Sequence, residues 1–210
     1  PPDELWPEGF QDIWTQNHRE FLPETWKKWM VPASGTEYGM IQDYYDAENP
    51  EQMIYKFGAA ARDAMRFAIE NCRRGKKNGT AGQPFACNGF MLWKLNDSWP
   101  SIYCAAIDYY LMPTMVYYTL KEAYQPVLLS FDGVENKDHI ALWGVNDSSE
   151  AIQGEIRLTV RELETGRMVN TAVLPVFLPA HDSVCFTSLD FLGQLRRTWM
   201  LSAELIDQNG

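Results

Sequence analysis

Four side chains that suit a sugar lie close together near the middle of the chain. Trp93 stands in the apolar run Phe90–Leu95, and Asn96, Asp97 and Trp99 follow directly after it. The apolar C–H face of a sugar ring packs on an indole, while its hydroxyl groups need hydrogen-bond donors and acceptors such as amides and carboxylates. These residue types in one short segment therefore predict a pocket for a polyhydroxylated ligand.

The segment that carries these side chains has the pattern of a buried strand with a polar end. Ala86–Leu95 is almost continuously apolar, which indicates a strand buried on both faces. A strand that delivers polar groups and aromatic rings at its carboxyl end is how a (β/α)-barrel enzyme builds its pocket. We therefore expect this strand to position the candidate site.

Two helices are predicted on either side of that strand. Asn49 can cap the first, and Gln52 stands three residues after the cap, as in a capping box. Over Met53–Arg74 apolar residues recur at helical spacing, the last turn is basic, and Gly75 can end the helix. The second helix is expected over Thr114–Tyr124. The first half of the chain therefore has the order helix, strand, helix.

Beyond Pro126 apolar and polar residues alternate, as in strands with one buried face. We predict six strands, at about 126–131, 139–146, 154–163, 167–177, 182–189 and 198–206. An antiparallel sandwich of the immunoglobulin-like type has about seven. The chain stops at Asn209-Gly210, a hairpin signal, so we expect a last strand to be missing.

An ordered set of motifs connects the two halves. It consists of Leu92-Trp93-Lys94-Leu95-Asn96-Asp97-Ser98-Trp99-Pro100, Ile107-Asp108-Tyr109-Tyr110, Pro113, Tyr117-Tyr118, Lys121-Glu122-Ala123 and Pro126-Val127. This set resembles the end of the catalytic barrel in family-2 glycoside hydrolases, in their β-mannosidase and exo-β-glucosaminidase branch. The resemblance implies a retaining β-glycosidase acting on a β-linked oligosaccharide or glycoside, in a chain far longer than this one.

The resemblance also implies the fold class, an α+β multidomain fragment. Residues 1–125 would be the last βα part of a (β/α)8 TIM barrel, since a complete barrel takes about 250 residues. Residues 126–210 would be the immunoglobulin-like antiparallel β-sandwich. The upstream domains of the parent enzyme would then be this chain's partners.

Each candidate site residue has a structural alternative. In the family the indole on the last barrel strand floors the subsite that holds the sugar to be cleaved, and this role is expected for Trp93. Asn96 and Asp97 either line the pocket or bond backbone groups in the turn, as Asn and Asp often do. Trp99 is a candidate for which core packing is the stronger interpretation. For Asp108 we expect a structural hydrogen-bonding role.

Retaining glycosidases need two carboxyls about 5–5.5 Å apart, one acid/base and one nucleophile. In the family both are glutamates on earlier barrel strands. Gly35-Thr36-Glu37-Tyr38-Gly39 superficially fits the nucleophile motif, but the residues before it are too few and too broken by proline for a central strand. We therefore expect Glu37 to be a loop carboxylate and the isolated chain to be inactive.

Composition excludes several other classes of function. The formal charge of −10 argues against nucleic acid or an anionic membrane as partner, and no apolar run approaches the roughly 20 residues that span a bilayer. Neither the three histidines nor the four cysteines have the paired spacing of a metal site. There is no glycine-rich phosphate loop either, so no cofactor is expected. The cysteines are expected to be buried free thiols.

A second hypothesis remains beside the enzyme fragment, namely a non-catalytic carbohydrate-binding or scaffold module. Its main support is Trp143, expected on an exposed strand face. Separately, surfaces that would meet a missing barrel should expose apolar area, so we expect the fragment to self-associate. Asn146-Asp147-Ser148, Asn78-Gly79-Thr80 and Asn96-Asp97-Ser98 match the glycosylation pattern, a number of short matches close to chance.

Overall fold

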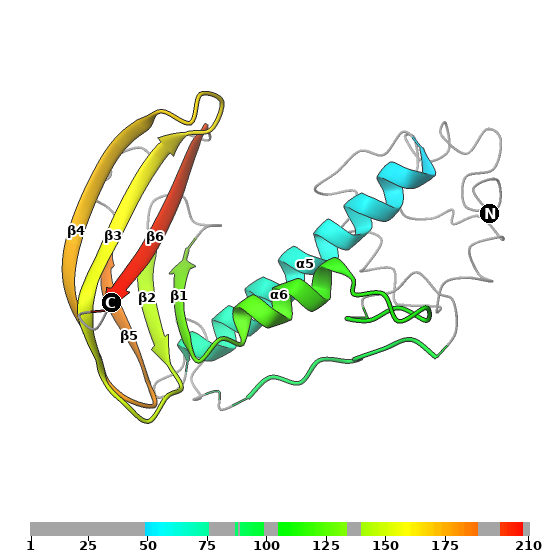
Figure 1. Ribbon diagram of the computed structural model, residues 1–210, viewed down its shortest axis with the longest axis horizontal. Coiled ribbons are helices and arrows are strands. Elements are labelled where there is room, and N and C mark those ends of the chain that lie inside the picture. The colour runs from blue at the N-terminus through cyan, green and yellow to red at the C-terminus, as the bar shows by residue number, and fades with distance from the viewer. Residues whose placement is uncertain are drawn as a thin grey trace. The chain divides into compact units, whose positions relative to one another are not determined.

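The computed structural model describes residues 49–75, 87, 89–98, 105–133, 140–188 and 198–207. The chain divides into two compact units. Unit 1 comprises Pro1–Ala68 and Met91–Ala123, and unit 2 comprises Ile69–Phe90 and Tyr124–Gly210. Two helices and six strands are formed within the described residues (Figure 1).

Unit 2 is a sandwich of two antiparallel three-stranded sheets (Figure 1). In one sheet β2 (Ala141–Asn146) lies between β1 (Val127–Asp132) and β5 (Asp182–Ser188). In the other, β3 (Ile152–Glu162) lies between β4 (Met168–Leu178) and β6 (Trp199–Asp207). The six strands predicted from alternation are confirmed, with ends that differ by no more than two residues. The strand expected to follow Asn209-Gly210 lies outside the described residues.

The inward faces of both sheets form one apolar core. Leu142 of β2, Ile156 and Leu158 of β3 and Val176 of β4 are buried at its centre. Residues of β1, β5 and β6 pack against them, among them Phe131, Phe186, Leu201, Ala203 and Leu205. On β3 the buried positions are every second residue, as expected when one face of a strand meets the core.

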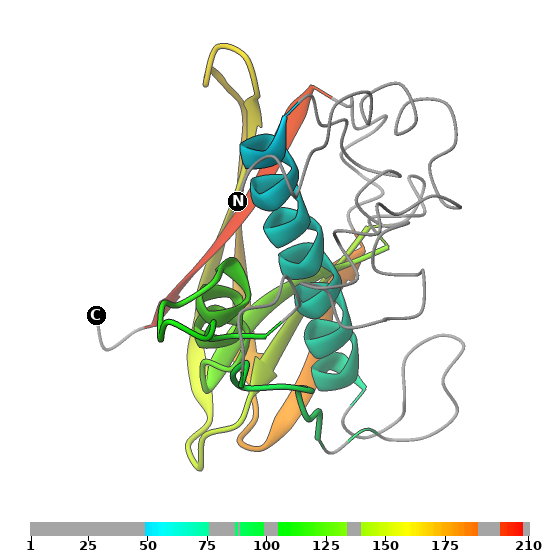
Figure 2. The same cartoon turned by 90° about the vertical axis from the view of Figure 1, so that its right-hand side faces the viewer.

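α5 (Pro50–Arg74) begins at the predicted cap. The backbone N–H of Gln52 donates to Asn49 Oδ1 at 2.9 Å, which satisfies one of the N–H groups that have no partner inside the helix. Both views show α5 as one uninterrupted helix (Figure 2). In unit 1 a Cβ on Gly58 would lie 3.3 Å from Met115 Sδ at the start of α6 (Met115–Ala123), so the absent side chain allows close packing. Both predicted helices are confirmed.

The last turn of α5 belongs to unit 2, where two consecutive arginines hold it against the sandwich. Arg73 Nη2 forms an ion pair with Asp147 Oδ2 at 2.7 Å and donates to the carbonyl oxygen of Gln125 at 2.8 Å. The Oγ of Ser183 on β5 donates to the carbonyl oxygen of Arg74 at 2.7 Å. The helix end is therefore bonded to both the start and the fifth strand of the sandwich.

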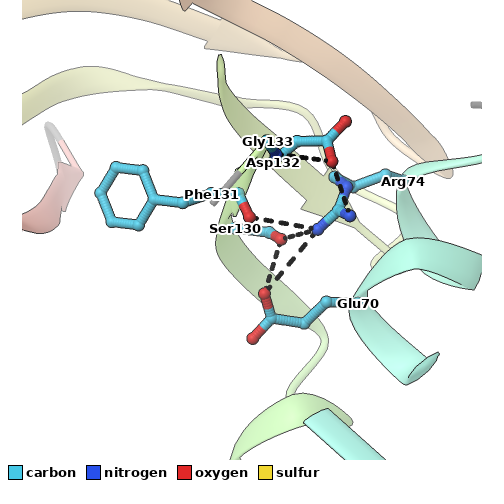
Figure 3. A network of polar contacts seen from close by, with 6 residues as sticks. All are labelled: Glu70, Arg74, Ser130, Phe131, Asp132 and Gly133. Carbon is cyan, nitrogen blue, oxygen red and sulfur yellow. Dashed lines mark hydrogen bonds and ion pairs between the residues drawn. The ribbon is translucent and has the colours of Figure 1, made fainter. Parts of the chain in front are cut away.

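Arg74 lies at the centre of a buried polar cluster, which we define as Glu70, Arg74, Ser130 and Asp132 (Figure 3). Arg74 Nη1 donates to Ser130 Oγ at 2.6 Å, and Nη2 forms an ion pair with Asp132 Oδ1 at 3.1 Å. Ser130 Oγ in turn donates to Glu70 Oε2 at 2.6 Å. Arg74 is 3% exposed and Glu70 is 7% exposed, so these charges depend on one another rather than on water.

Asn146 joins two turns at the end of β2. Its Nδ2 donates to the carbonyl oxygens of Glu150 at 2.8 Å and Pro179 at 3.1 Å. Its Oδ1 accepts from both the backbone N–H and the Oγ of Ser148, at 2.9 and 2.6 Å. The side chain is fully buried, and its amide nitrogen is already used, so Asn146 is not disposed to carry a glycan.

Candidate functional site

The segment that carries the predicted site belongs to unit 1 and pairs with the residues before α6. Ile107 N–H donates to the carbonyl oxygen of Leu95 at 2.9 Å, and Asp97 N–H donates to that of Ile107 at 3.1 Å. This short parallel pairing holds one point of the segment, the bridge between Asn96 and Ile107. Thr114 Oγ1 donates to the carbonyl oxygen of Ala105 at 2.8 Å and connects the pairing to the start of α6.

The strand predicted over Ala86–Leu95 is wrong for the part of that range that the structure describes. Cys87 and residues 89–95 are extended or bent but belong to no strand. A central parallel strand needs a ladder on both sides, whereas the described backbone bonds of this segment are a single one from Cys87 N–H to Gly75 and a short pairing with residues 106–107 that begins at Lys94. Continuous apolar character alone therefore did not determine that a strand forms here.

Trp93 presents its indole openly. The residue is 78% exposed, and the Trp93–Lys94 peptide bond is cis. The neighbouring apolar residues Met91 and Leu95 are 93% and 62% exposed. An indole in this state has a face available for the apolar side of a ligand.

Asp97 differs from Trp93 because it is buried, with 4% of its surface exposed. Its Oδ1 forms an ion pair with Lys94 Nζ at 2.5 Å. A buried carboxylate is stable only when a cation or hydrogen bonds compensate its lost hydration, and Lys94 supplies that charge. Lys94 stands three residues before Asp97, a spacing visible in the sequence, but no role was predicted for it.

The remaining candidates divide into one exposed residue and two outside the described residues. Asn96 is exposed and contributes its backbone to the bridge with Ile107. Trp99 and Glu37 lie outside the described residues, so their expected roles stay predictions. Trp93, Asn96 and Asp97 are therefore close in sequence, but Trp93 and Asn96 are exposed whereas Asp97 is buried.

Asp108 has the structural role predicted for it. Its Oδ1 accepts from the backbone N–H of Met112 at 2.8 Å, and its own N–H donates to the carbonyl oxygen of Met112 at 3.0 Å. These bonds close a tight turn in which Leu111 has a φ of 63°. The turn connects Ile107, which pairs with the segment of the candidate site, to the residues that lead into α6.

The described residues contain neither a metal-binding cluster nor a membrane-spanning helix. No group of three or more His, Cys, Asp or Glu side chains is arranged there to hold a metal ion. None of the helices described has the length and apolar character needed to cross a membrane.

The sandwich has a family match. Residues 138–210 match the Mannosidase Ig/CBM-like domain. This segment is therefore similar to the immunoglobulin-like domain of mannosidases. It comprises β2 to β6, so the sandwich predicted from alternation coincides with a known domain type.

Relatives of known activity extend the similarity upstream of that domain. The chain is 26% identical over 149 residues to β-mannosidase B of Aspergillus niger, an alignment that covers 64% of this chain and 17% of that protein. β-Mannosidase B of Aspergillus fumigatus is similar to the same extent. The chain thus spans about a sixth of the length of these relatives. The resemblance to a C-terminal region of family-2 glycoside hydrolases is confirmed.

Solved structures show the same fold. The crystal structure of β-D-mannosidase from Dictyoglomus thermophilum superposes with a TM-score of 0.70 at 22% identity, covering 84% of this chain and 21% of that one. An exo-chitosanase of Amycolatopsis orientalis, solved as a complex with PNP-β-D-glucosamine, superposes with a TM-score of 0.65 at 18% identity, covering 82% and 20%. These likenesses concern the fold, a sandwich domain preceded by the end of a barrel.

Proposed function

We propose that this chain is the C-terminal portion of a retaining β-glycoside hydrolase of the β-mannosidase type, which hydrolyses O-glycosidic bonds. The observation that carries the proposal is the match over 149 residues to β-mannosidase B, because it extends well beyond the sandwich domain. The substrate would be a β-linked oligosaccharide or glycoside. The remaining length of such a protein would supply the other barrel strands.

In this proposal residues 1–125 are the C-terminal part of the barrel domain and residues 126–210 the sandwich. Trp93 would form one wall of the sugar pocket, with Asn96 and Trp99 beside it. The 78% exposed indole supports this assignment, because a ring with an open face can pack on a sugar. For Asp97 the buried ion pair with Lys94 favours the support of that wall over direct contact.

We expect the 210-residue chain alone to be inactive. Both catalytic carboxyls would lie upstream, so p-nitrophenyl β-mannoside, β-glucosaminide and β-galactoside should show no enzymatic release of nitrophenol, which absorbance measures directly. Glu37→Gln is the control. Turnover that this substitution abolishes would make Glu37 the nucleophile and overturn the assignment.

The proposal itself is tested in the full-length protein that contains this chain, which should hydrolyse a β-mannoside or β-glucosaminide. Trp93→Ala should lower its kcat/KM by about 10- to 100-fold, because the apolar contact of a buried ring is worth about 1.5–3 kcal/mol. Initial rates over a range of substrate concentrations give kcat and KM for the wild type and for the variant.

Phe177→Ala is the matched control, since Phe177 is an aromatic residue of β4 that is 58% exposed. Its kcat/KM should equal that of the wild type. A full-length protein inactive on every β-mannoside and β-glucosaminide would contradict the enzyme proposal. Loss of polysaccharide binding in Phe177→Ala alone would instead favour the binding-module alternative, for which Trp143 is now a weaker candidate because it is half-buried.

A further inference from the structure

Lys94 and Asp97 form a largely buried ion pair directly after Trp93, within unit 1. Lys94 Nζ lies 2.5 Å from Asp97 Oδ1, and the two side chains are 26% and 3% exposed. Among the described residues no well-oriented N–H or O–H group donates to this Oδ1, so the ammonium of Lys94 compensates its charge. Loss of Lys94 would leave a buried carboxylate without its cation, a larger cost than for an ion pair on an open surface.

The backbone fixes the same short stretch of chain. The carbonyl oxygens of Lys94 and Leu95 accept from the N–H groups of Ala106 and Ile107, at 3.4 and 2.9 Å. The N–H of Asp97 donates to the carbonyl oxygen of Ile107 at 3.1 Å. Lys94 is therefore held both at its main chain and at its side chain, and the direction of the chain is fixed at the residue that follows the indole.

The side chains along this stretch alternate in exposure. Residues 91, 93 and 95 are exposed, and residues 92 and 94 are half-buried. Trp93 therefore lies on the accessible side of the segment, whereas the ammonium of Lys94 is directed to the buried carboxylate of Asp97. A ligand that packs on the indole would meet Trp93 and not this ion pair.

We propose that Lys94 is a positioning residue for the sugar pocket, because its ion pair with Asp97 sets the orientation of the Trp93 indole. The inference rests on the proposed function, in which Trp93 forms one wall of that pocket. Groups that contact a substrate must be held within a fraction of an ångström, so a supporting residue without ligand contact can change the rate strongly. Lys94 has this supporting place next to the indole.

The kinetic test is Lys94→Met in the full-length protein, which keeps most of the aliphatic stem and removes the charge. Its kcat/KM should fall by about 10-fold, because the indole is no longer held in place. In a Trp93→Ala background the same substitution should change kcat/KM by less than about twofold, because the ring that it positions is already absent. A purely structural role would lower the amount of active protein by the same factor in both backgrounds.

Three further variants separate positioning from misfolding. Lys94→Met combined with Asp97→Asn leaves no buried carboxylate without a cation, so it should fold like the wild type and still show the loss of kcat/KM. Lys94→Arg keeps a positive charge and should retain kcat/KM within about threefold. Lys121→Met is the matched control, since Lys121 is exposed on α6 and its loss should leave kcat/KM unchanged.

A second measurement reports on the indole without catalysis. The 210-residue chain is labelled with 5-fluorotryptophan, and the fluorine resonance of Trp93 is the one that Trp93→Phe removes. In Lys94→Met its transverse relaxation rate should fall, because the ring gains rotational freedom, whereas the exposed-lysine control should leave it unchanged. The sample is kept reduced, since the expectation of buried thiols is wrong for half-buried Cys72 and Cys87 and for exposed Cys185.

The outcomes distinguish this inference from the proposed function. A full-length protein inactive on every β-mannoside and β-glucosaminide would overturn the proposed function, and the relaxation of Trp93 would still decide whether Lys94 holds the indole. An unchanged relaxation rate in Lys94→Met would overturn the positioning role. An equal loss of kcat/KM with and without the indole would overturn it as well.

Discussion

Arg74→Met is expected to lower the free energy of unfolding of unit 2 by about 3–5 kcal/mol, the cost of breaking a buried ion pair from one side. Methionine keeps most of the aliphatic stem but removes the guanidinium. The carboxylate of Glu70 would then lie buried without its cation, and Asp132 would lose its partner at 3.1 Å. Urea unfolding, followed by pulsed hydrogen exchange on peptides of β1 to β3, reports on unit 2 alone.

The environment of Arg74 explains the size of this effect. Burial lowers the pKa of its guanidinium, and the carboxylates of Asp132 and Glu70 raise it in part. Burial of the Arg74 charge therefore costs free energy, and the carboxylates of Asp132 and Glu70 offset part of that cost. Its removal leaves the buried carboxylate of Glu70 without its cation, with the hydrogen bond from Ser130 as partial compensation.

Arg157→Met is the matched control. Arg157 forms an ion pair with Glu204 at 3.4 Å, but both side chains are more than half exposed. Its loss should cost less than about 1 kcal/mol. Equal losses in the two variants would refute the buried-charge explanation. Adding Glu70→Gln to Arg74→Met should restore part of the stability, and no recovery would assign the loss to packing instead.

The elements of this chain were predictable because their signals are local. Asn49 and Gln52 mark the start of α5, and alternation marks β3, where Ile156 and Leu158 face the core. Each signal spans only a few residues and reflects one local requirement. The start of a helix needs a cap for its N–H groups, and a strand at the core needs one apolar face. The partners of the strands could not be predicted this way. The place of β2 between β1 and β5 depends on pairs of residues as far apart in sequence as Ala141 and Ser188.

The polar contacts were missed for the same reason. Arg73 and Arg74 were interpreted only as favourable charges at a helix end, since Ser130 and Asp132 lie 56 and 58 residues from Arg74. Glu70 stands four residues before Arg74, and this pair was the one local hint of a cluster.

The candidate site could likewise be predicted only in part from the sequence. An indole and two polar residues stand close together in the sequence, and the structure leaves Trp93 78% exposed, so its role as a ligand contact stays a prediction. The sequence could not show that Asp97 is turned inward to Lys94, because burial depends on the surrounding fold. Apolar residues over Ala86–Leu95 indicated burial, but a strand forms only where a neighbouring strand pairs with it.

Asn146→Asp should be the second large loss, about 3 kcal/mol or more at pH 7.5. The substitution keeps the shape of the side chain and the acceptor for Ser148. It removes the Nδ2 donor and places carboxylate oxygens against the carbonyls of Glu150 and Pro179, at a position that is fully buried. Two acceptors lose their donor, and a negative charge replaces a neutral amide at a fully buried position.

The loss of stability in Asn146→Asp should also depend on pH, whereas the loss from a simple packing defect should not. Burial raises the pKa of the new carboxyl in the folded chain above the unfolded value of about 3.9. Between these values the folded chain binds a proton that the unfolded chain does not, so stability falls as the pH rises. The deficit relative to wild type should therefore shrink from pH 7.5 to pH 4.5, where the protonated carboxyl can again donate one hydrogen bond.

Asn170→Asp isolates the effect of burial. Asn170 is exposed on β4, and its Oδ1 accepts from the backbone N–H of Thr171 at 2.8 Å, a bond that aspartate retains. This variant should unfold like the wild type at both pH values. A deficit in Asn146→Asp that does not change with pH would show that the carboxyl reaches water, and that the turns joined by Asn146 open to admit it.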